Sequence, residues 1–309
     1  MALHATASAD VQAAASTAAE PVSADGQLVL DAPADQAESQ KRPQLSEDRA
    51  PSPASTSEPQ QPAKRRKPNV PPPTMVRKEA TFAAGVWANA AVLVDKPKDW
   101  TSFDVCGKLR GALKTKKVGH AGTLDPMATG LLIICTGQGT KQIDNFVAME
   151  KAYSGTLRLG QATPSYDAMS EIEEELPWEH ITYEDLEAAK QAYVGDILQQ
   201  PPMFSAIKIK GERLYKAARR GEVVERQSRP VTIHSFELRR DEGNKRDVHF
   251  RVSCSKGTYI RSLAHDLGKA VGSAAHLTAL RRESIGEYDV ADAWSVPDLV
   301  AAAHAARQA

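Results

Sequence analysis

One short stretch, residues 117–136, holds the side chains of this sequence that are best spaced for chemistry. It reads KVGHAGTLDPMATGLLIICT and presents His120 and Asp125 among three glycines, just before an apolar run. Pro126 directly follows Asp125, and a residue that precedes proline is pushed towards extended or turn geometry. The pattern predicts a lone carboxylate held on a rigid loop, where a carboxylate can act as a nucleophile or a base.

The same residues are also ordinary turn formers. Asp125 could simply cap its own loop, and on the residues alone this turn interpretation is the favoured one. The stretch lacks the Gly-Lys-Ser/Thr ending of a P-loop and the G-x-G-x-x-G of a dinucleotide-binding turn. Cys106, Cys135 and Cys254 are widely spaced, so we expect no disulfide framework and no metal site.

Hydrophobic periodicity and capping signals predict the elements that must position this loop. A helix is expected from Thr101 or Ser102 to Leu113, with Phe103, Val105, Cys106 and Leu109 facing inward. Further helices are expected over 139–149, 183–194 and 259–271 and from Pro297, and strands over 91–95, 131–136, 153–159, 231–238, 247–254, 276–282 and 288–290. Hairpins with interspersed helices, without strict βαβ repetition, indicate an α+β fold with a mixed, mostly antiparallel sheet.

Residues 1–75 differ in composition from the rest of the chain. They hold 11 of the 19 prolines and none of the 17 aromatic residues, so we expect a disordered tail. A linker over 76–90 and one catalytic domain over 91–309 are expected to follow. No apolar run is long enough to cross a membrane.

The tail also bears on localisation. Residues 1–40 contain six acids and no Lys or Arg, which argues against an organelle transit peptide. The basic cluster 64–67, KRRK, is typical of a nuclear-import patch, although a solvated basic run is the plain alternative. Nucleus or cytoplasm is therefore favoured over an organelle.

A second basic region spans residues 208–229. Eight Lys or Arg, including Lys208, Arg219 and Arg220, stand against three acids, whereas the whole chain has a formal net charge of zero. Such a patch can bind a phosphate backbone, and it can equally be the solvated face of a short helix. The patch alone does not decide for RNA.

The stretch 119–130, GHAGTLDPMATG, closely resembles the catalytic motif of the TruB family of tRNA pseudouridine synthases. The resemblance continues in the family's order between about Val92 and Trp294, through LVDKP at 93–97, KAY at 151–153, RLG at 158–160, PMFSAIK at 202–208, CSKGTYIR at 254–261 and LRR at 280–282. It implies the pseudouridine synthase fold. It also implies conversion of a uridine in the T loop of tRNA, uridine 55, to pseudouridine, without a cofactor and by a monomer that needs no protein partner.

The resemblance also implies a role for individual residues. Asp125 matches the catalytic carboxylate, Arg261 its cationic partner, and Tyr153 the tyrosine that stacks on the target base. Tyr259 and Leu280 match the walls of the uracil pocket. His120 matches the residue that fills the space of the flipped base, and Lys96 lies in a loop that supports the site.

Two departures from the family pattern stand out. After Gly160, Pro164 and Ser170 replace an acid and a glycine of the usual motif, while Asp167 keeps the second acid. The chain also ends about fifteen residues after Trp294, so we expect no RNA-binding PUA domain. Two other functions stay open: a tRNA-binding or tRNA-folding factor without catalysis, and a guide-dependent synthase that acts on other RNAs.

Overall fold

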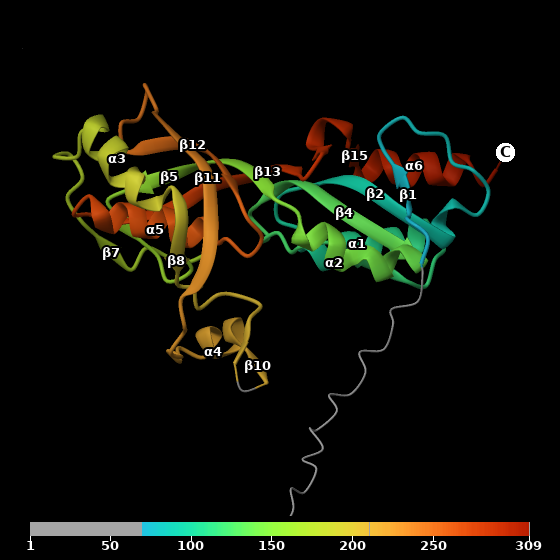
Figure 1. Cartoon of the computed structure of the whole chain (residues 1–309), viewed down its shortest axis with the longest axis horizontal. Coiled ribbons are helices and arrows are strands. Elements are labelled where there is room, and N and C mark those ends of the chain that lie inside the picture. Colours follow the sequence, from blue (N-terminus) through green and yellow to red (C-terminus); the bar gives the residue numbers. More distant parts are fainter. Residues whose placement is uncertain (1–69, 210, 309) are drawn as a thin grey trace, which may run out of the picture. The chain divides into compact units, whose positions relative to one another are not determined.

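The computed structural model describes residues 70–209 and 211–308, all within one compact unit, Arg65–Ala309. The expected tail up to residue 69, with its basic cluster, lies outside the described residues. The main sheet is mixed (Figure 1), and its eight principal strands follow the order β1 Thr74–Val76, β2 Asn89–Lys96, β4 Thr129–Gly137, β13 Ala275–Ile285, β5 Lys151–Leu159, β12 Asp247–Cys254, β11 Arg229–Arg240 and β8 Gly195–Gln199. β1 runs parallel to β2 and β13 runs parallel to β4, while the other neighbours are antiparallel. The α+β prediction is confirmed.

Helices cover both faces of the half of the sheet that contains β2 and β4. Val92, Leu132 and Ile134 pack on the side of α1 (Ser102–Ala112) and α6 (Val296–Ala305). Leu93 and Ile133 belong to the core on the other side, which α2 (Ile143–Ala148) helps to form. Burial on both faces explains why these strands read as continuous apolar runs rather than as an alternation.

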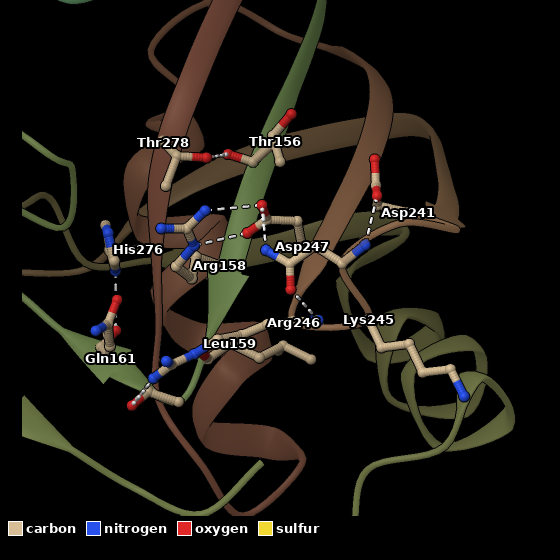
Figure 2. Close-up of polar contacts among 12 residues, drawn as sticks. Thr156, Arg158, Leu159, Gln161, Asp241, Lys245, Arg246, Asp247, His276 and Thr278 are labelled. Carbon is tan, nitrogen blue, oxygen red and sulfur yellow. Dashed lines mark hydrogen bonds and ion pairs between the residues drawn. The ribbon is translucent and has the colours of Figure 1, made fainter. Parts of the chain in front are cut away.

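The other half of the sheet is apolar on one face and polar on the other. Leu157 and Val252 point into the core shared with Leu263 and Leu267 of α5 (Ile260–Ala270), beside α3 (Tyr183–Lys190). On the polar face, the Nε and Nη2 of Arg158 donate to the two carboxylate oxygens of Asp247 at 2.7 and 2.8 Å (Figure 2). This division produces the period-two alternation that marks these strands in the sequence.

Shorter elements complete the described chain. They are the strands β3 Val118–His120, β6 Gln161–Ala162, β7 Glu174–Glu175, β9 Lys208–Ile209, β10 Glu212–Arg213, β14 Tyr288–Asp289 and β15 Trp294–Ser295, the helix α4 Leu214–Arg219, and the 3-10 turns η1 Val86–Ala88, η2 Gln138–Gln142, η3 Gln191–Tyr193 and η4 Val290–Asp292. Within residues 70–209 and 211–308, no helix is long and apolar enough to cross a bilayer.

Three sequence-based expectations differ from the structure. The boundary between tail and linker falls inside β1, whose Val76 is buried against the main sheet, so residues 76–90 are not a plain linker. The Phe103 side chain is 68% exposed, because α1 packs through Val105, Cys106 and Leu109 instead. The helix expected over 139–149 is a 3-10 turn, η2, followed by the short helix α2.

Candidate active site

Asp125 lies in the loop between β3 and β4, and its main chain is fixed on both sides. Before it, the Ser102 hydroxyl accepts from the Leu124 N–H at 2.9 Å and donates to the Leu124 carbonyl at 3.2 Å. After it, the Lys96 ammonium donates to the Pro126 carbonyl at 3.2 Å. Ser102 is placed by the capping box of Thr101 and Asp104 at the start of α1. The carboxylate therefore stands on a loop with little freedom.

Lys96 is fully buried at the end of β2. Its Nζ also donates to the carbonyls of Pro97 at 2.7 Å and Trp100 at 2.6 Å. With the Pro126 carbonyl, the ammonium therefore donates to three main-chain oxygens. Burial lowers the pKa of Lys96 to about 8, although the nearby Asp125 carboxylate acts in the opposite direction. The expected supporting role of Lys96 thus has a definite geometry: it clamps the turn that carries Asp125.

Arg261, in the first turn of α5, forms a two-point ion pair with Asp125. Its Nε lies 2.9 Å from Asp125 Oδ2, and its Nη2 donates to Oδ1 at 3.2 Å. The Arg261 side chain is only 5% exposed, whereas that of Asp125 is 34% exposed. A buried guanidinium thus presents a carboxylate that a ligand can still reach.

A second carboxylate, Asp167, meets the same guanidinium. The Arg261 Nε lies 3.6 Å from Asp167 Oδ2, while the Ser165 hydroxyl and the Met169 N–H donate to Asp167 Oδ1 at 2.6 and 3.0 Å. Burial raises the pKa of Asp125, the Arg261 cation opposes that rise, and the Asp167 charge adds to it. The pKa of Asp125 is therefore raised overall, and the Arg261 cation limits the rise because it favours the ionised form.

The sequence showed Asp167 only as the surviving acid of an altered motif and gave no sign that it touches Arg261. The Arg261 guanidinium is further held by carbonyls, with Nη1 donating to Ser165 at 2.7 Å and Nη2 donating to Phe204 at 2.8 Å. Neither contact has a local sequence signal, since Phe204 and Ser165 meet Arg261 only in the folded chain.

The aromatic and apolar residues of the motif set lie on elements next to the Asp125 loop. Tyr153, on β5, packs against the core cluster that contains Leu124 and Leu280, and Leu280 lies on the neighbouring strand β13. Burial raises the pKa of Tyr153 and that of Tyr259, and the charge of Asp125 contributes to both shifts. Tyr259 directly precedes α5, which carries Arg261.

Tyr259 is positioned by a buried amide. It is the N-cap residue of α5 but offers no side-chain cap. Instead, the Tyr259 N–H donates to the Oε1 of Gln199 at 2.7 Å, and the Nε2 of Gln199 donates back to the Tyr259 carbonyl at 3.0 Å. Gln199 thereby fixes the point at which α5 begins, and with it the direction of Arg261.

His120 ends β3, five residues before Asp125. Burial lowers its pKa and so favours the neutral imidazole. Its Nδ1 is buried and has no hydrogen-bond partner within the described part of the chain. His120 is thus a half-buried ring beside the Asp125 loop, and its expected role of filling the space of the flipped base stays a prediction.

The cations of the basic segment 208–229 differ from one another in their contacts. The exposed Arg220 is paired with Glu212 at 2.8 Å and with Glu222 at 2.7 Å, so it is not the free cation that was expected. Arg219 is exposed, with its guanidinium 5.4 Å from the centre of the Tyr215 ring. Lys208 lines a cavity of about 390 Å³ with Arg226 and others.

A main-chain connection links α4 to the pocket. The Ser205 carbonyl accepts from the Tyr215 N–H at 3.1 Å, and the preceding residue, Phe204, is the one whose carbonyl binds Arg261. The basic segment is therefore anchored at the rim of the site, without contributing a side chain to the Asp125 cluster.

Two family models match adjacent stretches of the chain, which together cover residues 110–309. One is the TruB family pseudouridylate synthase N-terminal domain, over residues 110–260, and the other is the tRNA pseudouridylate synthase B C-terminal domain, over residues 261–309. A tRNA pseudouridine synthase B from Flavobacterium johnsoniae is 51% identical over 209 residues, which are 65% of this chain and 90% of the relative. The chain belongs to the TruB family.

Other relatives agree with this placement. The tRNA pseudouridine synthase B of Thermobifida fusca is 47% identical over 220 residues, 69% of this chain and 75% of the relative. Among solved structures, a chain of a Cbf5–Nop10–Gar1 complex superposes with a TM-score of 0.52 at 28% identity, covering 68% of this chain and 53% of that one. The predicted pseudouridine synthase fold is confirmed.

Proposed function

We propose that this protein isomerises a uridine in the T loop of tRNA, uridine 55, to pseudouridine. The observation that carries the proposal is the two-point Asp125–Arg261 ion pair in a chain of the TruB family. Two relatives, of which this chain covers 87% and 90%, are named tRNA pseudouridine synthase B, which supports tRNA as the substrate.

The reaction breaks the bond between C1′ and N1, turns the uracil, and joins C1′ to C5. The hydrogen leaves C5 and the former N1 gains one, so atoms and electrons balance without a redox partner. Asp125 supplies the carboxylate, whether it bonds to the sugar or to the uracil ring, and both routes need it ionised. Arg261 favours that ionised form and fixes both oxygens by its two-point contact.

The target base must leave its stack to reach Asp125, because a stacked nucleotide hides C1′ and C5. Tyr153 offers a ring face for the flipped base, and Tyr259 and Leu280 form the walls of the uracil pocket. Loops of RNA present bases that can be splayed out at low cost, which favours the T arm over a helical region. Since Asp125, Tyr153 and Arg261 all come from one chain, the protein acts as a monomer in this proposal.

The test uses purified protein and an unmodified tRNA transcript, with pseudouridine mapped by carbodiimide adducts that stop primer extension. We expect one new pseudouridine, in the T loop, and none when that uridine is replaced by cytidine. Binding without modification would favour the tRNA-folding function. Modification that appears only with an added guide RNA would favour the guide-dependent one.

A further inference from the structure

Three cations are buried around the site without a salt bridge in the described part of the chain. Lys96, Lys151 and Arg282 are 0%, 7% and 1% exposed, and their hydrogen-bond partners are main-chain carbonyls. A buried charge without a counter-ion is costly unless hydrogen bonds compensate for it. Lys96 clamps the Asp125 turn and Lys151 ends a short helix, but the proposed mechanism gives Arg282 no task.

Arg282 sits where the two halves of the sheet meet. In β13, it lies opposite Tyr153 of β5 on one side and opposite Gly130 of β4 on the other. Gly130 has a φ of 102°, and a Cβ there would lie 2.3 Å from the Arg282 carbonyl oxygen, so only glycine allows this approach. The strands are therefore drawn closely together around the arginine.

The Arg282 guanidinium bridges the two sides of the Asp125 loop. Its Nε donates to the Leu131 carbonyl at 2.7 Å, and its Nη2 donates to the Gly122 carbonyl at 3.2 Å. Gly122 lies three residues before Asp125 and Leu131 six residues after it. One side chain thus ties together the entry and the exit of the loop that carries the carboxylate.

Arg282 also stands directly opposite Tyr153 across β13 and β5. Its cation and the Asp125 carboxylate are both electrostatic neighbours of the Tyr153 phenol. A residue outside the proposed catalytic group therefore holds the Asp125 loop and lies beside Tyr153.

We propose that Arg282 is a positioning residue of the reaction, which holds both sides of the Asp125 loop with one guanidinium. The inference rests on the proposed function, in which Asp125 carries the isomerisation. It predicts that Arg282 acts on the rate and not on tRNA affinity, because its side chain is 1% exposed and out of reach of the RNA.

The experiment compares Arg282→Met with Arg77→Met, an exposed arginine that pairs with Asp292 at 2.6 Å. Single-turnover rates at saturating tRNA and equilibrium binding are measured for each. We expect Arg282→Met to lose about 100-fold in rate with unchanged affinity, because a misplacement of about 1 Å at a reacting group costs on the order of 100-fold. Arg77→Met should match wild type in both. A wild-type rate for a folded Arg282→Met would overturn the proposal.

If Arg282→Met fails to fold, Arg282→Lys is measured instead. Lysine keeps the positive charge but lacks the forked guanidinium donors. A wild-type rate for Arg282→Lys would equally count against the proposal.

A readout without activity separates this inference from the proposed function. In protein labelled with 3-fluorotyrosine, the ¹⁹F resonance missing from Tyr153→Phe reports Tyr153. We expect Arg282→Met to shift that resonance, because the cation opposite Tyr153 is lost, and Arg77→Met to leave it in place. An unshifted resonance would sink the positioning role, whereas a shifted one in a wild-type protein inactive on tRNA would refute only the proposed function.

Discussion

Replacing Lys96 with methionine tests how a buried ammonium supports the Asp125 loop. Burial lowers the pKa of Lys96 from 10.5 to about 8. Between these two values the unfolded chain holds a proton that the folded chain has released, so stability rises with pH. The rise is about 1.4 kcal/mol per pH unit, or about 3 kcal/mol over the whole window. The methionine variant lacks this contribution.

The assay is urea unfolding of wild type and Lys96→Met between pH 7 and pH 10, with the exposed Lys98→Met as a control for losing a lysine. As pH rises above about 8, the free energy of unfolding of wild type should increase relative to that of Lys96→Met. Lys151, whose pKa burial also lowers to about 8, is present in both proteins and cancels in the difference. The reasoning would be refuted if the free energies of unfolding of the two proteins ran parallel with pH. It would also be refuted if that of wild type fell relative to that of Lys96→Met as pH rises.

Three further predictions concern other parts of the molecule. Arg261→Lys should lower the saturated rate by about 100-fold or more, because lysine cannot make the two-point contact with Asp125; a rate near wild type in single-turnover assays would show that the fork is dispensable. Arg219→Ala should flatten the log–log salt dependence of tRNA binding by roughly 0.7 to 0.9, and Arg220→Ala should flatten it less, because Glu212 and Glu222 already pair with Arg220; equal slopes in filter binding would contradict this difference. A chain lacking residues 1–75 should melt below one lacking residues 1–69, because the longer deletion removes Thr74 and Met75 from β1; equal melting temperatures would mean that β1 adds no stability.

Local signals predicted the parts of the site that are close in sequence. Asp125 before Pro126 indicated a loop, and Thr101 indicated the start of α1, which in turn places Ser102 against that loop. The apolar run 131–136 indicated a buried strand, and β4 is one. These features depend on neighbours along the chain, so the residues alone were sufficient.

Contacts across the chain had no such signal. Arg261 meets Asp125 across 136 residues, and only the resemblance to a family linked them. Asp167 and Gln199 were not predicted to support the site, since a buried polar residue that holds a partner looks like any other polar residue in a sequence. The three residues of β1 are likewise too few to show a period, which is why the expected tail extended into them.

The most direct test of the account is the single-turnover rate of Asp125→Asn on unmodified tRNA, measured beside its equilibrium affinity. Asparagine keeps the size of the side chain but not its charge, so the loop held by Lys96 and Ser102 should be preserved. We predict no pseudouridine in the T loop and nearly unchanged tRNA binding. A rate that remains a sizeable fraction of wild type would contradict the claim that this carboxylate carries the isomerisation.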